Sequence, residues 1–371
     1  MRAVDLPDVD APRGSGNVHR VISRVLRTRG NRAAGLAAVA VVAALSLTAC
    51  NSTDSSSGST PSPSVSSAAP SSATPSASAT PSASATPTTP ATVITSLDAI
   101  TVTGAAGKAP TVTAKWPIRI AKTTSKVLTA GSGIALQADS TVRINYAGIN
   151  ARTGKTFDSS FTRGASATFS LSQVVAGFQK GLIGHKVGDR VLIMMPGSDA
   201  YDSQGGNEQA GIAKGDSLIF VVDILAASYP TATGTAVTPA AGLPTVTVKN
   251  NIPTVTIGKA AKPSTLVTQT LIKGPGPKVT ATDGIQVRYR SWAWSNGRMI
   301  EDGFSGEAVT GEMSGVIEGW RKGLVGQTVG SRVMLIVPPS MAYPQGNATP
   351  SIAKNETLVY VVDILYAESA Q

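Results

Sequence analysis

The chain contains almost no cysteine or histidine. Its 371 residues include one Cys and two His, so it cannot form an intramolecular disulfide or a Cys-rich zinc site, and a His-based metal centre has few candidate ligands. A phosphate-binding glycine loop is also missing, because the pair Gly205-Gly206 is not followed by the Lys and Ser/Thr that such loops require. Aromatic residues make up only 5% of the chain. We therefore expect neither a metal nor a cofactor.

Acidic residues are scarce relative to basic ones. The chain has 32 Lys and Arg against 22 Asp and Glu, a formal net charge of +10, and such a balance raises the question of a nucleic-acid partner. Seven Arg and three Asp lie in residues 1–49, and removal of this segment lowers the net charge to +6. Acids and bases are interspersed in the rest of the chain, without the concentrated basic patch that binds a phosphate backbone. The composition therefore argues against nucleic acid as a partner.

The N-terminal segment is typical of an export signal. Five Arg between positions 20 and 32 precede an uncharged, mostly apolar run at residues 33–49, which is the order of regions in a secretory signal peptide. The run leads into LTAC at residues 47–50. This motif resembles the lipobox of bacterial lipoproteins, in which a peptidase cuts before the Cys and a diacylglycerol is attached to its thiol. We expect Cys50 to be lipidated and to anchor the protein at the outer face of the cell membrane. The alternative is a transmembrane anchor, for which the run is at the short limit.

Residues 50–92 consist almost entirely of Ser, Thr, Ala, Pro and Gly after the Cys. Such a segment buries too little apolar surface to offset its ordering entropy, so we expect a disordered tether. It would hold a folded part of the chain away from the membrane. A linker without any length requirement is the alternative interpretation.

The remaining residues contain an internal repeat. PTVT at residues 110–113 recurs at 253–256, and VRINY at 142–146 recurs as IQVRY at 285–289, both with an offset of 143. GFQKGLIG at 177–184 recurs as GWRKGLVG at 319–326, and SLIFVVDIL at 217–225 recurs as TLVYVVDIL at 357–365. A period of this length is far longer than that of a solenoid and predicts two tandem domains. We place them at residues 93–230 and 243–371, separated by a Thr/Ala/Gly/Pro-rich stretch.

Each copy is rich in strand-forming residues. Runs of apolar and β-branched residues at 142–146, 190–195 and 218–225 predict strands. Val175, Phe178 and Leu182 have the i, i+3, i+7 spacing of one helical face, and the second copy repeats this spacing with apolar residues at 317, 320 and 324. One short helix against an antiparallel sheet is an α+β fold.

An ordered series of motifs gives each copy a family resemblance. In the first copy the series reads YxG at 146–148, GKTFDSS at 154–160, FSL at 169–171, VVAGF at 174–178, GDRV at 188–191, AY at 200–201, GI at 211–212 and LIF at 218–220. The set resembles the FKBP-type peptidyl-prolyl cis-trans isomerases, over about residues 125–228 and 268–368. The resemblance implies a curved antiparallel sheet wrapped around the short helix, with a shallow apolar pocket between them. The segments that precede the two cores share the PTVT motif, which suggests an added strand or strap in each domain.

The resemblance also assigns a pocket to each copy. In the first copy the assigned residues are Tyr146, Phe157, Asp158, Val174, Val175, Phe178, Tyr201, Ile212 and Phe220. In the second copy they are Tyr289, Ile300, Glu301, Val316, Ile317, Trp320, Tyr343, Ile352 and Tyr360. The pocket floor is usually Trp in the family and is Phe178 in the first copy. The second copy has Ile300-Glu301 in place of Phe157-Asp158, so we expect its site to be weaker.

Such a pocket suits one reaction in particular. A prolyl amide isomerises over a barrier of about 18–20 kcal/mol, and its twisted transition state loses amide resonance and much of the amide dipole. An apolar cradle therefore favours that transition state over the planar ground state. We expect a monomeric prolyl isomerase that assists folding of exported, proline-containing polypeptides in unfolded or extended form, with the first copy more active. The alternatives are a non-catalytic chaperone or peptide-binding module that uses the same grooves, and a structural spacer whose assigned aromatic residues are ordinary core residues.

Overall fold

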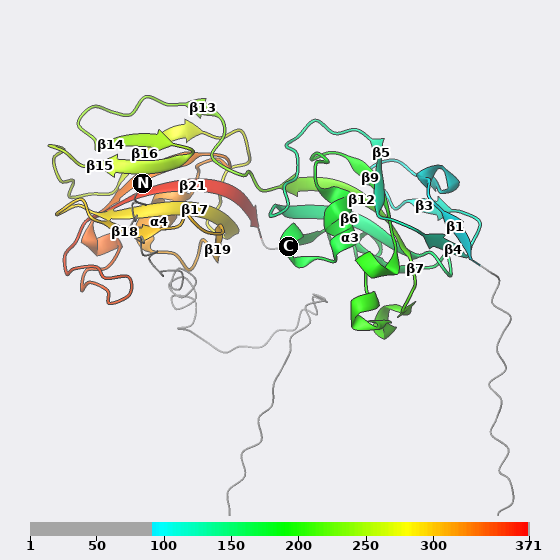
Figure 1. The fold of residues 1–371 in the computed structure, drawn as a ribbon. Helices are drawn as coiled ribbons and strands as arrows, with labels where there is room; N and C mark the ends of the chain where they lie inside the picture. The colour runs from blue at the N-terminus through cyan, green and yellow to red at the C-terminus, as the bar shows by residue number, and fades with distance from the viewer. Residues whose placement is uncertain (1–90, 370–371) are drawn as a thin grey trace, which may run out of the picture. The chain divides into compact units, whose positions relative to one another are not determined.

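The computed structural model describes residues 91–369, which form two sheet-dominated domains with few helices (Figure 1). The expected export signal, Cys50 and nearly all of the expected tether lie outside the described residues. Within residues 91–369, no helix has both the length and the apolar character needed to cross a membrane.

The first domain is built on one antiparallel sheet of six strands. The strands lie in the order β5-β9-β12-β6-β7, and β8 pairs with the first part of β6. The strands of the whole first domain, inside and outside this sheet, are β1 (Thr92–Ile94), β2 (Thr101–Thr103), β3 (Thr111–Thr113), β4 (Ile118–Ile120), β5 (Thr124–Thr129), β6 (Thr141–Asn150), β7 (Thr156–Ser159), β8 (Ala167–Ser170), β9 (Arg190–Met195), β10 (Gly206–Asn207), β11 (Ile212–Ala213) and β12 (Leu218–Ala227). Its helices are α2 (Ser160–Arg163) and α3 (Ala176–Leu182).

Helix α3 packs closely on the inner face of this sheet (Figure 1). A Cβ atom on Gly181 would lie 2.4 Å from the Ile193 side chain, and one on Gly177 would lie 2.7 Å from the sulfur of Met195. Both distances are below any ordinary contact, so only glycine lets the helix approach β9 this closely. The apolar stripe of the helix, Phe178 and Leu182, is then buried in the core. The helix expected from the spacing of these residues is confirmed.

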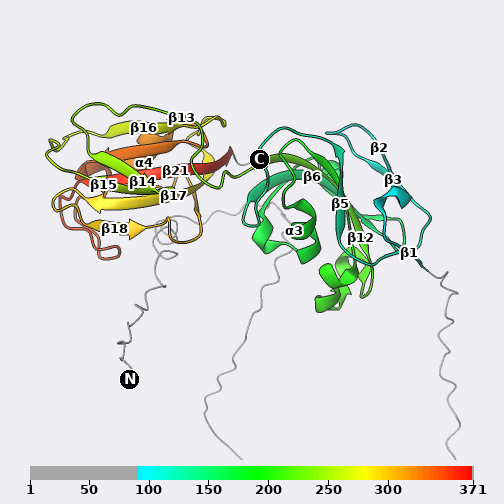
Figure 2. The same ribbon diagram turned by 45° about the horizontal axis from the view of Figure 1, so that its top comes forward.

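The outer face of the same sheet is also buried. Residues 92–120 fold over it, and Figure 2 shows the β2–β3 hairpin and α3 on opposite sides of the sheet. Both strands of this hairpin have the sequence TVT, and their register pairs Val102 with Val112. These valines pack on a second hydrophobic core with Leu192, Met194 and Ile219. The added strand predicted from PTVT at residues 110–113 is therefore confirmed as β3, in a hairpin with β2.

The first domain has one helix more than the sequence predicts. Helix α2 is a single turn directly after β7. The Ser159 hydroxyl accepts a hydrogen bond from the backbone N–H of Thr162, and Gly164 ends the turn in the left-handed conformation. Apolar periodicity cannot reveal a helix of one turn, which explains why the expectation of one helix per domain was wrong here.

The second domain repeats this plan with an extra edge strand. Its seven-stranded sheet has the order β13-β16-β20-β21-β17-β18, and β19 pairs with β17. Its strands are β13 (Thr235–Ala236), β14 (Thr245–Lys249), β15 (Ile252–Thr256), β16 (Val267–Lys273), β17 (Asp283–Ala293), β18 (Met299–Asp302), β19 (Val309–Glu312), β20 (Arg332–Val337) and β21 (Leu358–Ser369). Its helix is α4 (Glu318–Leu324), and Gly319 and Gly323 face β20 as their counterparts face β9.

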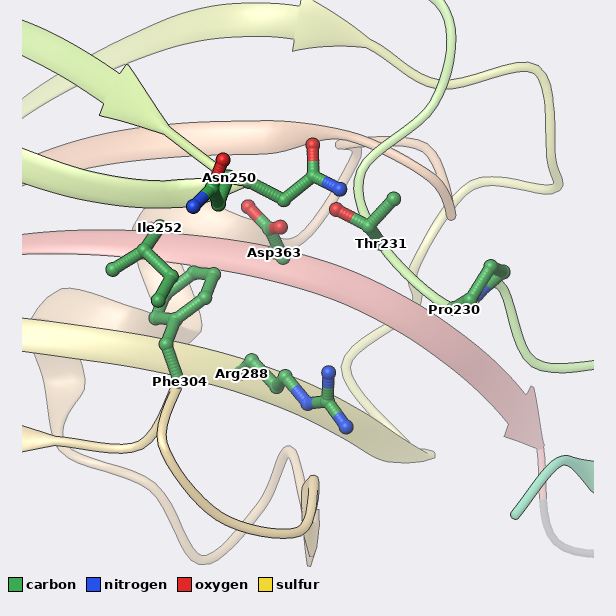
Figure 3. A pocket seen from close by; sticks show the side chains of 8 residues that line it. Pro230, Thr231, Asn250, Ile252, Arg288, Phe304 and Asp363 are labelled. Atoms are coloured by element: carbon green, nitrogen blue, oxygen red, sulfur yellow. The ribbon is translucent and has the colours of Figure 1, made fainter. Parts of the chain in front are cut away.

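The outer face of the second sheet is covered in the same way. The β14–β15 hairpin contributes Val246 and Val255 to a core with Trp292 and Met334. Residues 229–243, where we expected the boundary between domains, run along this domain, because the N–H of Tyr229 donates to the carbonyl of Leu365 and β13 pairs with β16. At the end of this face, side chains of several elements line a small cavity (Figure 3).

Candidate active site

The pocket of the first domain is a well of aromatic rings. Phe178, on α3, meets Phe220 of β12 edge-on, with 5.0 Å between the ring centroids. Phe157 of β7 lies 5.6 Å from Phe220 at an interplanar angle of 90°, and Phe169 of β8 lies 5.9 Å from Phe178. Edge-to-face aromatic pairs of this kind contribute more stabilisation than the burial of their apolar surface alone. The sheet and the helix thus contribute one rigid apolar surface.

The remaining apolar residues assigned to this pocket join the same cluster. Val174 and Val175 precede α3, Tyr201 follows a short 3₁₀ turn, and Ile212 begins β11. All four pack on the core that contains Phe178 and Phe220, and only Ile212 is fully buried. The structure therefore brings together all the apolar residues assigned from the sequence.

A polar corner borders the well. The Tyr146 hydroxyl donates to the Asp158 carboxylate, and the Arg163 guanidinium forms an ion pair with the same carboxylate. The guanidinium also lies 3.1 Å from the Tyr146 oxygen and 5.4 Å from the centre of its ring. Burial, followed by the hydrogen bond to Asp158, raises the pKa of Tyr146 to about 12, so the phenol stays protonated and continues to donate. Arg163 was not predicted, because its guanidinium reaches this corner only through the turn of α2.

Tyr201 presents a hydroxyl without a protein partner. Among the described residues this hydroxyl makes no hydrogen bond, whereas that of Tyr146 is engaged. Burial and the nearby charge of Asp158 raise the pKa of Tyr201, so the group is an O–H donor at neutral pH. It is therefore available to donate to a bound acceptor.

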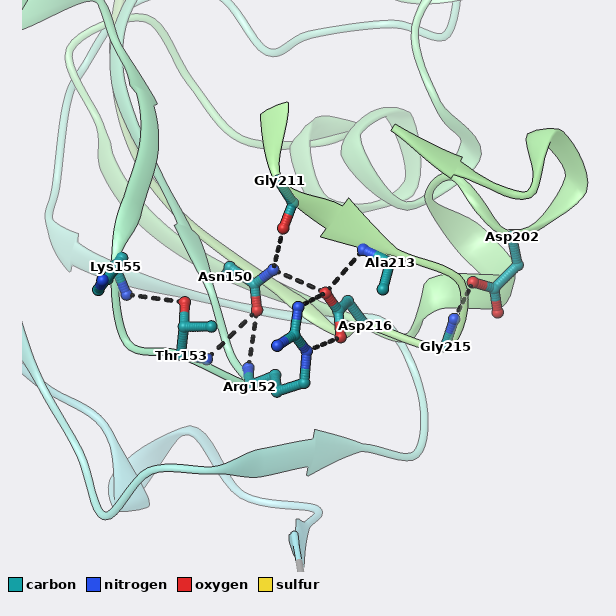
Figure 4. A network of polar contacts seen from close by, with 9 residues as sticks. All are labelled: Asn150, Arg152, Thr153, Lys155, Asp202, Gly211, Ala213, Gly215 and Asp216. Atoms are coloured by element: carbon teal, nitrogen blue, oxygen red, sulfur yellow. Dashed lines mark hydrogen bonds and ion pairs between the residues drawn. The ribbon is translucent and has the colours of Figure 1, made fainter. Parts of the chain in front are cut away.

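The loops around Tyr201 are held by a network of polar contacts (Figure 4). The Arg152 guanidinium binds Asp216 through Nε and Nη2, at 2.7 and 3.0 Å, and the Asn150 amide donates to the same carboxylate at 2.7 Å. The Asp202 carboxylate accepts from the backbone N–H of Gly215 at 2.7 Å. This contact ties the segment after Tyr201 to the loop before β12. These contacts restrict the wall of the pocket that carries Tyr201 and Ile212.

In the second domain the well is built from different rings. Tyr289 of β17 lies 4.9 Å from Trp320 of α4, and Trp320 lies 5.5 Å from Tyr360 of β21. These three rings are each at most 5% exposed. The other apolar residues assigned to this pocket pack on the same core: Ile300, Val316, Ile317, Tyr343 and Ile352. The structure thus brings together the second assigned set as well.

Glu301 takes the place of Asp158 in this second pocket. Asp158 is opposite Gly148 in the pairing of β7 with β6, and Glu301 is opposite Ser291 in the pairing of β18 with β17. The Tyr289 hydroxyl donates to Glu301 at 3.0 Å, as that of Tyr146 does to Asp158. The Ser291 hydroxyl donates to the other carboxylate oxygen, also at 3.0 Å. The longer acid therefore keeps the tyrosine contact and gains a serine contact.

The changes at these positions depend on one another. A Cβ atom on Gly148 would lie 2.6 Å from the Phe157 ring and 2.9 Å from the Phe220 ring, so the first domain needs glycine there. In the second domain Ile300 replaces Phe157, and Ser291 has the side chain that Gly148 must lack. Because Ile300 has no ring, the closer of the two contacts is absent in the second domain, where Ser291 is opposite Tyr360 as Gly148 is opposite Phe220. Burial raises the pKa of Glu301, so the folded domain favours the protonated carboxyl more than an exposed glutamate does.

Comparison with known proteins identifies the family. The model of the FKBP-type peptidyl-prolyl cis-trans isomerase family matches residues 133–225 and again residues 276–365. The FK506-binding protein of Streptomyces anulatus is 40% identical over 98 residues, which are 26% of this chain and 78% of that protein. A probable FK506-binding protein of Corynebacterium glutamicum is 34% identical over 97 residues, 26% of this chain and 80% of that protein. This chain belongs to the FKBP-type peptidyl-prolyl cis-trans isomerase family.

A longer relative matches over a similar number of residues. The isomerase FkpA of Escherichia coli is 36% identical over 100 residues, which are 27% of this chain and 36% of FkpA. Every residue assigned to the two pockets lies within the segments that match the FKBP family model. The outer hairpins lie outside them, so they are additions to the FKBP core in this chain. No group of three or more His, Cys, Asp or Glu among the described residues could hold a metal ion.

Proposed function

We propose that the first domain is the principal prolyl isomerase of this chain and that it acts on exported polypeptides at the outer face of the cell membrane. The observation that carries the activity proposal is the aromatic well closed by Phe157, Phe178 and Phe220, beside an unpartnered Tyr201 hydroxyl. A proline ring entering this well leaves water and meets rigid apolar surfaces. The substrates are proline-containing segments in extended or unfolded chains.

The geometry supports a reaction without a covalent intermediate. As the amide twists, its nitrogen loses conjugation and its dipole shrinks, so an apolar wall becomes a better environment than water. The Tyr201 O–H donates to the carbonyl next to the proline and fixes it while the rest of the amide rotates. The contacts of Asp158 with Tyr146 and Arg163 hold the polar corner still. These fixed groups need little reorganisation during the reaction.

The second domain supports a binding role. Its pocket lacks the ring of Phe157 and has a carboxyl whose pKa is raised by burial. The buried indole nitrogen of Trp320 has no hydrogen-bond partner among the described residues. A backbone carbonyl of a bound chain would satisfy that donor. We propose that this domain holds proline-containing segments and catalyses their isomerisation more slowly than the first.

An isomerisation assay on the full chain tests the activity proposal. Phe157→Ala removes a wall of the first well, and we expect the isomerisation rate of a proline peptide to fall by about tenfold, equivalent to about 1.4 kcal/mol of transition-state stabilisation. Ile300→Ala is the matched control in the second domain, and we expect it to change the rate by less than about twofold. A folded wild-type chain without acceleration above background would refute catalysis. A larger loss from Ile300→Ala would reverse the assignment of the active copy.

The membrane location is tested separately. Residues 1–49 and Cys50 support a lipid anchor through their order of basic, apolar and LTAC segments. Cells expressing the chain should incorporate labelled fatty acid into it, and Cys50→Ser should abolish the label and release the protein from the membrane fraction. A Cys50→Ser chain that stays with the membrane would instead favour a transmembrane anchor.

A further inference from the structure

A cavity lies at one end of the outer face of the second domain, away from both pockets described above. Its volume is about 200 Å³. Its walls come from the segment before β13, the turn between β14 and β15, β17, the segment after β18, and β21 (Figure 3). The lining residues are Pro230, Thr231, Asn250, Asn251, Ile252, Arg288, Phe304 and Asp363. Nothing in the isomerase pockets uses these residues.

The floor of the cavity belongs to a row of charged residues across the sheet. Asp363 of β21 is opposite Arg332 of β20 on one side and opposite Arg288 of β17 on the other. Arg332 binds the Asp363 carboxylate through two nitrogens, at 2.6 and 2.7 Å, and the N–H of Ala232 donates to it at 3.2 Å. The Asp363 charge is therefore already balanced by Arg332. The positive charge of Arg288 is the excess in the row.

The first domain has the same row without this excess. There Asp223 is opposite Arg190 and Asn145, so the third member of the row is neutral. Two nitrogens of Arg190 bind Asp223, at 2.5 and 2.7 Å. The first domain therefore has only the ion pair in this row, whereas the second domain has the ion pair and the additional guanidinium of Arg288.

The first domain also covers its row with its own backbone. Residues 104–108, in the loop that joins β2 to β3, lie over the ion pair. Arg190 donates to the carbonyls of Gly104 and Lys108 at 2.8 and 2.7 Å, and the N–H of Gly107 donates to Asp223 at 2.7 Å. In the second domain the hairpin has only the tight turn at Asn250 and Asn251, both with positive φ. The shorter turn reaches the ion pair with one carbonyl, that of Asn251. The cavity occupies the place that the longer loop covers in the first domain.

Arg288 has hydrogen-bonding capacity left over. Its Nε is buried and has no hydrogen-bond partner among the described residues. Its Nη2 is 3.8 Å from a carboxylate oxygen of Asp139, and because the Asp139 side chain is 73% exposed, this pair is weak. A buried N–H of a charged group without a partner is costly. The Phe304 ring and Ile252 also line the cavity and give it apolar walls.

We propose that this cavity binds a carboxylate carried on a small apolar group. The carboxylate would accept hydrogen bonds from the Arg288 guanidinium, a pairing whose fork geometry suits two parallel bonds. The amide of Asn250 and the hydroxyl of Thr231 line the same cavity as further donors, and the apolar part of the ligand would contact Phe304 and Ile252. A free small carboxylate and the acidic side chain or C-terminus of a polypeptide share this chemistry.

Titration of the full chain with propionate tests the proposal. The signal is the side-chain Nε–H resonance of Arg288 in an NMR spectrum. We expect its chemical shift to change with propionate concentration and to reach a plateau. Arg288→Asn installs the residue of the first domain and should weaken propionate binding by at least about tenfold. Arg288→Lys keeps the charge but lacks the planar fork of the guanidinium, and it should weaken binding by several-fold. The matched control is Arg321→Asn on the exposed side of α4, which should change the affinity by less than about twofold.

The remaining arms distinguish the sources of the carboxylate. One peptide carries an Asp side chain and an amidated C-terminus, and a second ends in a free carboxylate after an apolar residue. Tighter binding of either peptide than of propionate points to a polypeptide ligand, and equal or weaker binding points to a free small carboxylate. The proposal is overturned if the Arg288 resonance does not shift, if chloride shifts it equally, or if Arg321→Asn weakens binding as much as a folded Arg288→Asn or Arg288→Lys chain. None of these readouts depends on isomerase activity.

Discussion

The paired differences at Gly148 and Phe157 predict a measurable energetic coupling. Gly148→Ser places a Cβ atom 2.6 Å from the Phe157 ring and 2.9 Å from the Phe220 ring. Attractive contacts between carbon atoms begin at about 3.5 Å, so the Phe157 ring must move by almost 1 Å. In the second domain Ser291 and Ile300 occupy these positions together without that conflict. The serine should therefore be harmful beside Phe157 and tolerated beside isoleucine.

The expected magnitudes follow from overpacking. Forcing extra atoms into a packed core typically costs about 1–3 kcal/mol, and we expect Gly148→Ser to fall in this range. Phe157→Ile alone removes part of a half-buried ring and should cost about 1 kcal/mol. If the two substitutions were independent, the double variant would lose the sum. Because isoleucine removes the closer contact, the one with the Phe157 ring, we expect the double variant to be more stable than that sum by about 1–2 kcal/mol.

Native-state hydrogen exchange on the full chain measures this coupling domain by domain. The amides of β6 and β12 report the free energy of opening of the first domain, and those of β17 and β21 serve as an internal control that should not change. A double-mutant cycle then gives the interaction term. Costs that add to within about 0.5 kcal/mol would refute the reasoning, because the clash would then contribute nothing.

Three further predictions concern the pocket and the ion pairs. Tyr201→Phe removes the unpartnered donor and should lower kcat by roughly tenfold in the peptide assay while leaving the unfolding midpoint unchanged; an unchanged kcat would contradict a role for the hydroxyl. Burial raises the pKa of Glu301, so the folded domain holds a proton that the unfolded chain releases. The resulting contribution to stability is present at acidic pH and is lost as the pH rises through the folded-state pKa. Glu301→Gln should make the free energy of unfolding, measured by urea titration between pH 4 and 8, less dependent on pH, and an unaltered pH profile would contradict this prediction. Asp223→Ala leaves the Arg190 charge buried without its partner and should destabilise the first domain by about 3–5 kcal/mol. Replacing both residues by apolar ones should recover only part of that loss, because the backbone groups of residues 104–108 that the pair binds then lose their partners. Calorimetric unfolding measures both losses, and equal losses for the single and double variants would contradict the prediction.

Much of the fold could be predicted because the chain repeats itself. The shared offset of two motifs predicts tandem domains, and three apolar residues per copy predict α3 and α4. The outer cores were only partly anticipated. The run at residues 218–224 is buried at every position, a pattern typical of strands covered on both faces. The PTVT motif suggested an added strand, but only the register of the hairpins shows that this strand covers the sheet.

The candidate site divides in the same way. The ordered motifs predict the residues of the well, because each aromatic ring lies on a strand or helix that one of the motifs identifies. They do not name Arg163, whose guanidinium reaches Asp158 through a one-turn helix held by Ser159 and Gly164. Nor do they show that Ser291 supports Glu301, because the motifs do not give the register that places these two residues opposite each other in β17 and β18. That the second copy is the weaker isomerase stays a prediction.

The two copies together separate what supports the fold from what shapes the pockets. Both retain glycines where the helix meets the sheet, and both retain a buried Arg–Asp pair on the outer face. In the pocket, three positions differ as a set: a larger side chain at Ser291 accompanies a smaller one at Ile300, and the longer acid Glu301 receives both hydroxyl donors. A serine introduced alone at Gly148 would clash with the Phe157 ring, which the combined change avoids. The second pocket therefore combines an apolar well with one carboxyl that two hydroxyls hold, so a search for a ligand of this pocket should test hydrogen-bonding groups as well as proline.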